Sequence, residues 1–221
     1  MGFWSGVWNG IKSIASSIST VLRESPLVRS LVTTLAAALP PPFDVIAVVA
    51  VQAIAASAGV EEKPDELGWQ MNEADKKPED FGSFKEYKEY LDREYPFDQE
   101  KFTSLSEEQK SACRYLGMAG TIMEVKEAKN FELTPETLGI IVRGAAGLKW
   151  TDAQMSGFAK GLSFSLNGSG VASLGDVESL ARGTLNPGKW DAVSGAITAG
   201  AKEAGVEQDT AAIIASLQEN V

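Results

Sequence analysis

Between residues 30 and 60 the chain carries one charged side chain, Asp44. A stretch this apolar must be buried in protein or placed in lipid, because apolar surface is unfavourable in water. Three successive prolines at positions 40–42 divide it, since each proline fixes φ and removes a backbone donor. The sequence therefore predicts an apolar helical hairpin over residues 27–60, with one helix on each side of the prolines.

The second helix of this hairpin, about residues 43–60, approaches the length of a membrane span. At about 1.5 Å per residue it would reach roughly 27 Å, slightly less than the ~30 Å hydrocarbon core of a bilayer. Its alanine and β-branched side chains suit either lipid or the centre of a helical bundle. Two interpretations are therefore open: a buried core element or oligomer contact, and a membrane-inserted or re-entrant hairpin.

Residues 1–24 predict an amphipathic, membrane-seeking helix. Apolar side chains recur there at three- and four-residue steps, which places them on one stripe of a helix. The opposite face is mainly Ser, Gly and Asn and has almost no charge, so binding would occur by apolar insertion rather than by attraction to anionic lipid. The side chains expected to contact the membrane are Phe3, Trp4, Val7, Trp8, Ile11, Ile14, Ile18, Val21 and Leu22. The alternative is that the same stripe packs on a protein partner.

Residues 61–103 predict an acidic connector. Six basic and fourteen acidic side chains lie between residues 61 and 100, together with several prolines and little periodicity. Ser83 and Glu86 match a capping box, and the apolar positions that follow predict one short helix that ends before Pro96.

Residues 104–221 predict a helical bundle domain. Capping boxes begin at Ser106 and Thr151, and Thr134 and Asn186 each precede a proline that can occupy the first position of a helix. No segment alternates as a strand would. We expect helices near residues 106–129, 134–148, 151–165, 173–182, 187–204 and 207–219. The fold class is therefore all-α, an N-terminal amphipathic helix and an apolar helical hairpin followed by a C-terminal helical bundle.

Glycines are frequent inside the predicted helices of the bundle. Each costs a helix about 1 kcal/mol relative to alanine, so a compensating interaction is expected. Close approach between helices is the simplest one. The glycines concerned are Gly117, Gly120, Gly144, Gly147, Gly157, Gly161, Gly195 and Gly200.

Two segments approach ligand-binding motifs without completing them. Gly183–Trp190 has the spacing of a phosphate loop, but Trp190 stands where a Ser or Thr hydroxyl would hold Mg²⁺. Ser165–Asp176 has the outline of an EF-hand loop, but only one of its ligand positions is a carboxylate. We expect both to be connectors between helices, and we expect no metal and no other cofactor.

Catalytic chemistry finds little support in the residue types. The chain has no histidine, and Cys113 is its one cysteine, which we expect to be a small buried side chain. We therefore expect a protein that is not an enzyme, although thirty acidic side chains leave a catalytic carboxylate pair open. The net charge of −10 argues against nucleic acid as a partner, since phosphate binding requires clustered lysine and arginine.

The segment VWNGIKSIASSI resembles the repeated Trp-x-x-Ile-Lys segments of tape-measure proteins from tailed phages. The resemblance rests on residues 8–13. It implies a virion or an injection machine, in which small helical proteins with membrane-active N-termini contact an envelope. No basic n-region or continuous apolar h-region is present, so no cleavable signal peptide is expected.

Together these features predict a non-enzymatic structural protein that contacts or perturbs a membrane, as a multi-copy component of a virion or injection-type assembly. Its expected partners are membrane lipid and other copies of itself or of an assembly protein, and its expected location is the virion or a membrane. A pore-forming or membrane-lytic toxin is a second hypothesis, with the hairpin as the inserting unit. A soluble helical protein-interaction module is a third.

Overall fold

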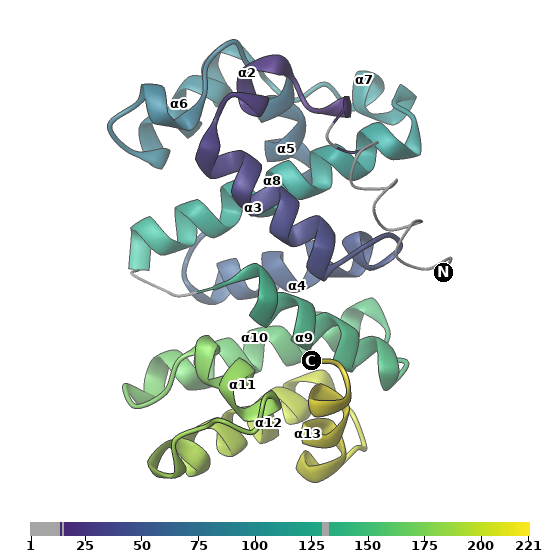
Figure 1. The fold of residues 1–221 in the computed structure, drawn as a ribbon, viewed down its shortest axis with the longest axis vertical. Helices are drawn as coiled ribbons and strands as arrows, with labels where there is room; N and C mark the ends of the chain where they lie inside the picture. Colours follow the sequence, from purple (N-terminus) through teal and green to yellow (C-terminus); the bar gives the residue numbers. More distant parts are fainter. Residues whose placement is uncertain (1–13, 15, 130–132) are drawn as a thin grey trace.

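The computed structural model describes residues 14, 16–129 and 133–221 (Figure 1). Within these residues it contains no strand, and it has twelve α-helices and two short 3-10 helices. The predicted all-α fold is confirmed. The helices are α2 (Thr20–Arg23), α3 (Pro26–Ala38), α4 (Phe43–Ser57), α5 (Pro64–Glu73), η1 (Pro78–Asp80), α6 (Phe84–Glu94), α7 (Gln99–Ser104), α8 (Glu107–Lys129), α9 (Pro135–Gly147), α10 (Asp152–Ser169), α11 (Leu174–Ala181), η2 (Pro187–Lys189), α12 (Trp190–Ala204) and α13 (Thr210–Glu219).

The apolar hairpin is formed by α3 and α4, and α4 lies in the middle of the molecule. Helices α5 and α8 pack on one side of α4, and α9 and α10 pack on the other (Figure 1). Ala50, Val51 and Ile54 of α4 are fully buried. Helix α3 also contacts both α8 and α9. Of the two interpretations of the hairpin, the structure shows the core element.

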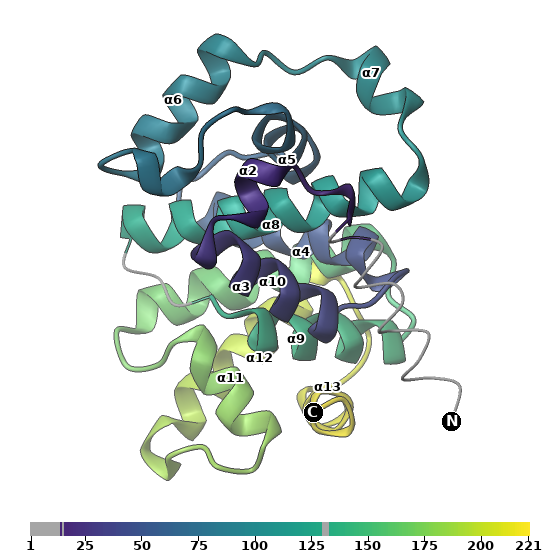
Figure 2. The ribbon, with the colours of Figure 1, turned by 45° about the horizontal axis from the view of Figure 1, so that its top comes forward.

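The segment between the hairpin and α8 is more than a connector, because α5 packs along α8. Pro64 occupies the start of α5, and Asp65 and Glu66 lie in its first turn, where negative charge favours the helix dipole. The sequence predicts one short helix, α6, in an otherwise irregular connector, because prolines and mixed charge favour loops; the structure adds α5, η1 and α7. Helices α6 and α7 form an outer arc over α5 and α8 (Figure 2).

Close contact between α5 and α8 depends on two glycines. A Cβ atom added to Gly68 would lie 1.7 Å from the carbonyl oxygen of Cys113, and one added to Gly117 would lie 1.6 Å from that of Pro64. Both glycines therefore let one backbone touch the other. Gly161 and Gly200 do the same between α10 and α12. Gly195 does not follow the prediction of close approach, because its added Cβ would meet open space.

The predicted domain boundaries do not divide the core. Buried apolar residues from the end of the N-terminal stripe to α13 form one hydrophobic cluster. Helices α8 and α9, both assigned to a separate bundle over residues 104–221, lie on opposite sides of the hairpin. The hairpin is thus part of the interior that this bundle was expected to build alone.

Capping chemistry sets many helix starts as predicted. The Thr151 hydroxyl accepts from the Gln154 backbone N–H at 3.3 Å, and the Gln154 side chain accepts from the Thr151 N–H at 3.0 Å. Ser106 and Gln109 form the same reciprocal pair. Ser83 caps α6, but the Glu86 carboxylate accepts from the Gly82 N–H rather than closing the box.

Candidate functional site

The described end of the N-terminal apolar stripe packs inside the protein. Ile14, Ile18 and Leu22 are 4%, 7% and 0% exposed, and all three belong to the hydrophobic core. Val21 is half-buried. The expectation of lipid contact is therefore corrected for Ile14, Ile18 and Leu22, since helical apolar periodicity suits a protein core as well as a bilayer. The other predicted contact residues, Phe3, Trp4, Val7, Trp8 and Ile11, lie outside the described residues.

The expected single helix over residues 1–24 is interrupted between Ser17 and Thr20. The Ser19 hydroxyl accepts a hydrogen bond from the Leu22 N–H at 3.4 Å, and Ser19 thereby caps α2. Its own N–H donates to Asn72 Oδ1 of α5 at 2.8 Å. Asn72 Nδ2 donates back to the carbonyl oxygen of Ser17 at 3.4 Å. This exchange joins residues 17–19 to α5.

A second tie fixes the start of α3. Ser25 is fully buried, and its hydroxyl accepts from the Val28 N–H at 3.1 Å, as an N-cap does. The same hydroxyl donates to Glu79 Oε1 at 2.6 Å. Residues 14–25 are thus joined to α5 and η1 by side-chain hydrogen bonds as well as by apolar packing.

Asp44 ties α4 to α8 through its buried carboxylate. It lies in the first turn of α4 and is 2% exposed. It accepts hydrogen bonds from Ser111 Oγ at 2.8 Å and from Arg114 Nη1 at 3.2 Å. Arg114 Nε also lies 3.8 Å from Asp65 Oδ1 of α5. Moving the hairpin into lipid would break a buried ion pair, and removing one partner of such a pair is strongly destabilising.

Among the described residues no single helix is long and apolar enough to span a bilayer. Helices α3 and α4 reach the length and apolar composition of a membrane span only when they are taken together, and the chain bends by 118° between them, at the prolines.

An apolar groove of about 590 Å³ lies between α3, the start of α6 and the second half of α8. Glu79, Lys126 and Glu127 are the charged residues that line it. A groove of this kind can take the apolar face of a peptide or helix. Its main apolar residues are Leu27, Leu31, Phe81, Phe84, Ile122 and Met123.

The two incomplete motifs are joined by an ion pair between Lys189 and Asp176. Lys189, the lysine of the phosphate-loop spacing, donates to both carboxylate oxygens of Asp176 at 2.9 Å. Asp176 is the last position of the EF-hand spacing, and it also accepts from the Ser173 N–H at 2.8 Å. The first part of that spacing is helical, because α10 extends to Ser169 and not only to residue 165. Both motifs therefore serve the packing of α10, α11 and α12.

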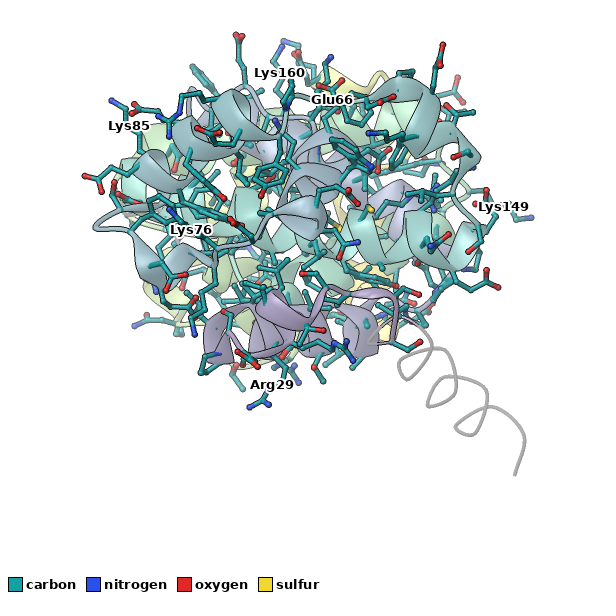
Figure 3. All side chains as sticks on the ribbon, turned by 90° about the horizontal axis from the view of Figure 1, so that it is seen from above. Arg29, Glu66, Lys76, Lys85, Lys149 and Lys160 are labelled. Atoms are coloured by element: carbon teal, nitrogen blue, oxygen red, sulfur yellow. The ribbon has the colours of Figure 1, made fainter. Side chains whose placement is uncertain are left out.

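The acidic side chains and Cys113 are the candidate metal ligands in the part of the chain that the structure describes. No group of three or more His, Cys, Asp or Glu there has the arrangement of a metal site. Cys113 is buried, and this burial raises the pKa of its thiol to about 12, which suppresses the reactive thiolate. Figure 3 shows Arg29, Lys85 and Lys149 projecting from separate sides of the molecule.

Comparisons of the chain with protein-family models, curated proteins and solved structures find no match.

Sequence reasoning missed the two tertiary features that organise this region. The groove is lined by residues from four separate segments, within 27–31, 78–84, 122–127 and 133–135, so no local pattern marks it. The tie between Asn72 and Ser19 is also long-range, although Asn72 on an otherwise packed helix is a polar residue that needs a partner.

Proposed function

We propose that the chain is a non-enzymatic structural protein that contacts a membrane through residues 3–11, with the helical body as its folded support. The observation that carries this proposal is the division of the apolar stripe. Ile14, Ile18 and Leu22 are buried in the core, and three aromatic residues, Phe3, Trp4 and Trp8, lie six to eleven residues before Ile14. An inserted segment at residues 3–11 would thus end three residues before Ile14, a side chain that is packed in the core.

The apolar content of residues 3–11 is sufficient for reversible membrane binding. Phe3, Trp4, Val7, Trp8 and Ile11 supply five large side chains, each worth about 1.5 kcal/mol or more when removed from water. Ordering the short segment offsets part of this gain. Tryptophan favours an interface in particular, because its ring is apolar and its N–H requires a polar partner. Residues 3–11 have no charged side chain and are followed by a single one, Lys12, so binding would depend little on salt.

A multi-copy role in a virion or injection-type assembly rests on the resemblance of residues 8–13 to tape-measure segments. Avidity supports it on physical grounds. Many copies arrayed together would convert weak binding of single segments into stable attachment. Other copies of the chain, or another assembly protein, are therefore the proposed protein partners.

The proposal is tested by flotation of the purified chain with neutral liposomes of small and large diameter. The variant to compare is Trp4→Ser combined with Trp8→Ser, which should lose most of its binding. Deleting residues 1–24 is unsuitable, because it would also remove Leu22 from the core. Trp190→Ser is the matched control, since Trp190 is an exposed tryptophan on α12, and it should float as the native chain does. Equal flotation of native chain and double variant would overturn the proposal.

The groove between α3, α6 and α8 favours a second candidate, a soluble helical interaction module. In that case the chain would bind an apolar helix or peptide and would not float with liposomes at all. A third candidate, the toxin, is distinguished from the structural protein by release of dye from sealed liposomes, which only a toxin should cause. Binding without release is expected, because the hairpin is held by core packing and by the Asp44–Arg114 ion pair.

A further inference from the structure

Three carboxylates and one lysine gather where α6 covers α5 and α8. Lys88 of α6 lies 2.7 Å from Glu62 Oε1 and 3.7 Å from Asp92 Oδ2. Asp92 Oδ1 also accepts from Gln70 Nε2 of α5 at 3.2 Å. Glu62 and Asp92 therefore both have partners.

Glu124 of α8 is the member of this cluster that lacks a partner for a buried atom. Its Oε2 atom is buried and makes no hydrogen bond. An unpartnered carboxylate oxygen is unfavourable when it is charged and acceptable when the group is neutral.

Burial and the neighbouring carboxylates favour the neutral form of Glu124, and one cation, Lys88, favours the ionised form. The charged neighbours are Glu62 before α5, Lys88 and Asp92 on α6, and Glu127 one turn further along α8. Burial, followed by repulsion from Glu62, raises the pKa of Glu124 from 4.5 to about 7. Lys88 is the one cation among these neighbours, and it is already paired with two carboxylates.

The same region contains the contact that closes α6 on α8. The backbone N–H of Phe84, the first residue of α6, donates to Glu127 Oε2 at 2.7 Å. Phe84 and Glu127 also line the apolar groove. A change in how α6 sits on α8 would therefore alter one wall of that groove.

We propose that Glu124 is a proton-dependent latch: α6 rests closed on α8 while Glu124 is neutral, and ionisation of Glu124 repels the carboxylates beside it, loosens α6 and opens the groove at that wall. Ionisation adds an uncompensated negative charge to a site that already has more carboxylates than cations. The repulsion acts across the α6–α8 contact, because Asp92 lies on α6 and Glu124 on α8.

The sign of the effect follows from the direction of the pKa change. The folded protein binds the Glu124 proton more tightly than the unfolded chain, because the folded pKa lies above 4.5. The stabilisation of the folded state by the Glu124 proton is complete below about pH 4.5 and is lost as the pH rises to about 7. Mildly acidic conditions therefore close α6, and mildly alkaline conditions loosen it.

Hydrogen exchange of the full chain at about pH 6 and pH 8, without lipid, tests the latch. After correction for intrinsic exchange, the opening constant of α6 amides should be about tenfold or more larger at pH 8, which corresponds to one unit of pKa change. Amides of α10, which lie away from the cluster, should change little. Because no lipid is present, the outcome does not depend on the proposed membrane contact.

Two substitutions separate the latch from general pH effects. Glu124→Gln keeps the shape and removes the charge, so α6 should be equally protected at both pH values. Glu89→Gln is the control, since Glu89 is an exposed carboxylate on α6, and it should retain the native difference. Equal protection of α6 at both pH values in the native chain would overturn the proposal. A difference that persists in Glu124→Gln would overturn it as well.

Discussion

Replacement of Gly117 by alanine tests whether α5 and α8 touch backbone to backbone. The added methyl group would lie 1.6 Å from the carbonyl oxygen of Pro64, 2.4 Å from its carbonyl carbon and 2.8 Å from its Cα. All three are backbone atoms, so no side-chain rotation can relieve the contact. Helix α5 would have to move away from α8.

The expected loss of stability is the difference between two effects. Overpacking a well-packed core costs about 1–3 kcal/mol, and the upper end applies because the obstacle is backbone. Alanine returns about 1 kcal/mol through its greater helix propensity. Gly117→Ala should therefore lower the free energy of unfolding by about 2 kcal/mol or more. For a chain of this size that corresponds to a fall in Tm of about 4–8 °C.

Urea unfolding followed by circular dichroism measures this difference. Gly195→Ala in α12 is the matched control, because its added Cβ would meet no atom within 4 Å. The control should be more stable than the native chain by about 1 kcal/mol. If Gly117→Ala were as stable as the control, the close packing of α5 on α8 would be refuted.

Four further outcomes follow from the same contacts. Arg114→Leu should lower the free energy of unfolding by about 3 kcal/mol in urea titrations, because it leaves Asp44 buried without its cation. Thr151→Ala should cost about 1 kcal/mol through loss of the α10 cap, measured in the same way. Residues 104–221 expressed alone should show no cooperative thermal melt, since α4 is missing from their core. The free energy of unfolding should decline between about pH 4.5 and pH 7 less steeply in Glu124→Gln than in the native chain.

Local chemistry made much of the fold predictable. The starts of α9 and α10 follow from Thr134 with Pro135 and from the Thr151 capping box, because capping depends on residues within one turn. The hairpin followed from the prolines at positions 40–42. These features need no knowledge of distant residues.

Long-range packing explains what the sequence left unresolved. Helix α5 looked like a loop, and its placement depends on Gly68 meeting the carbonyl of Cys113, which lies far away in the sequence. The stripe was ambiguous for a different reason, because the spacing of Ile14, Ile18 and Leu22 is the same for a lipid face and a protein core. The Glu124 cluster joins three separate segments, so no local sequence motif predicts it.

The most direct test of the central claim is hydrogen exchange of the full chain with and without neutral liposomes. The claim is that lipid is contacted by residues 3–11 while the hairpin stays in the core. New protection on adding liposomes should therefore be confined to peptides from residues 1–13, and α4 should exchange equally slowly in both states. Altered exchange in α4 would show that the hairpin leaves the core. Unchanged exchange throughout the chain would show that the protein makes no membrane contact.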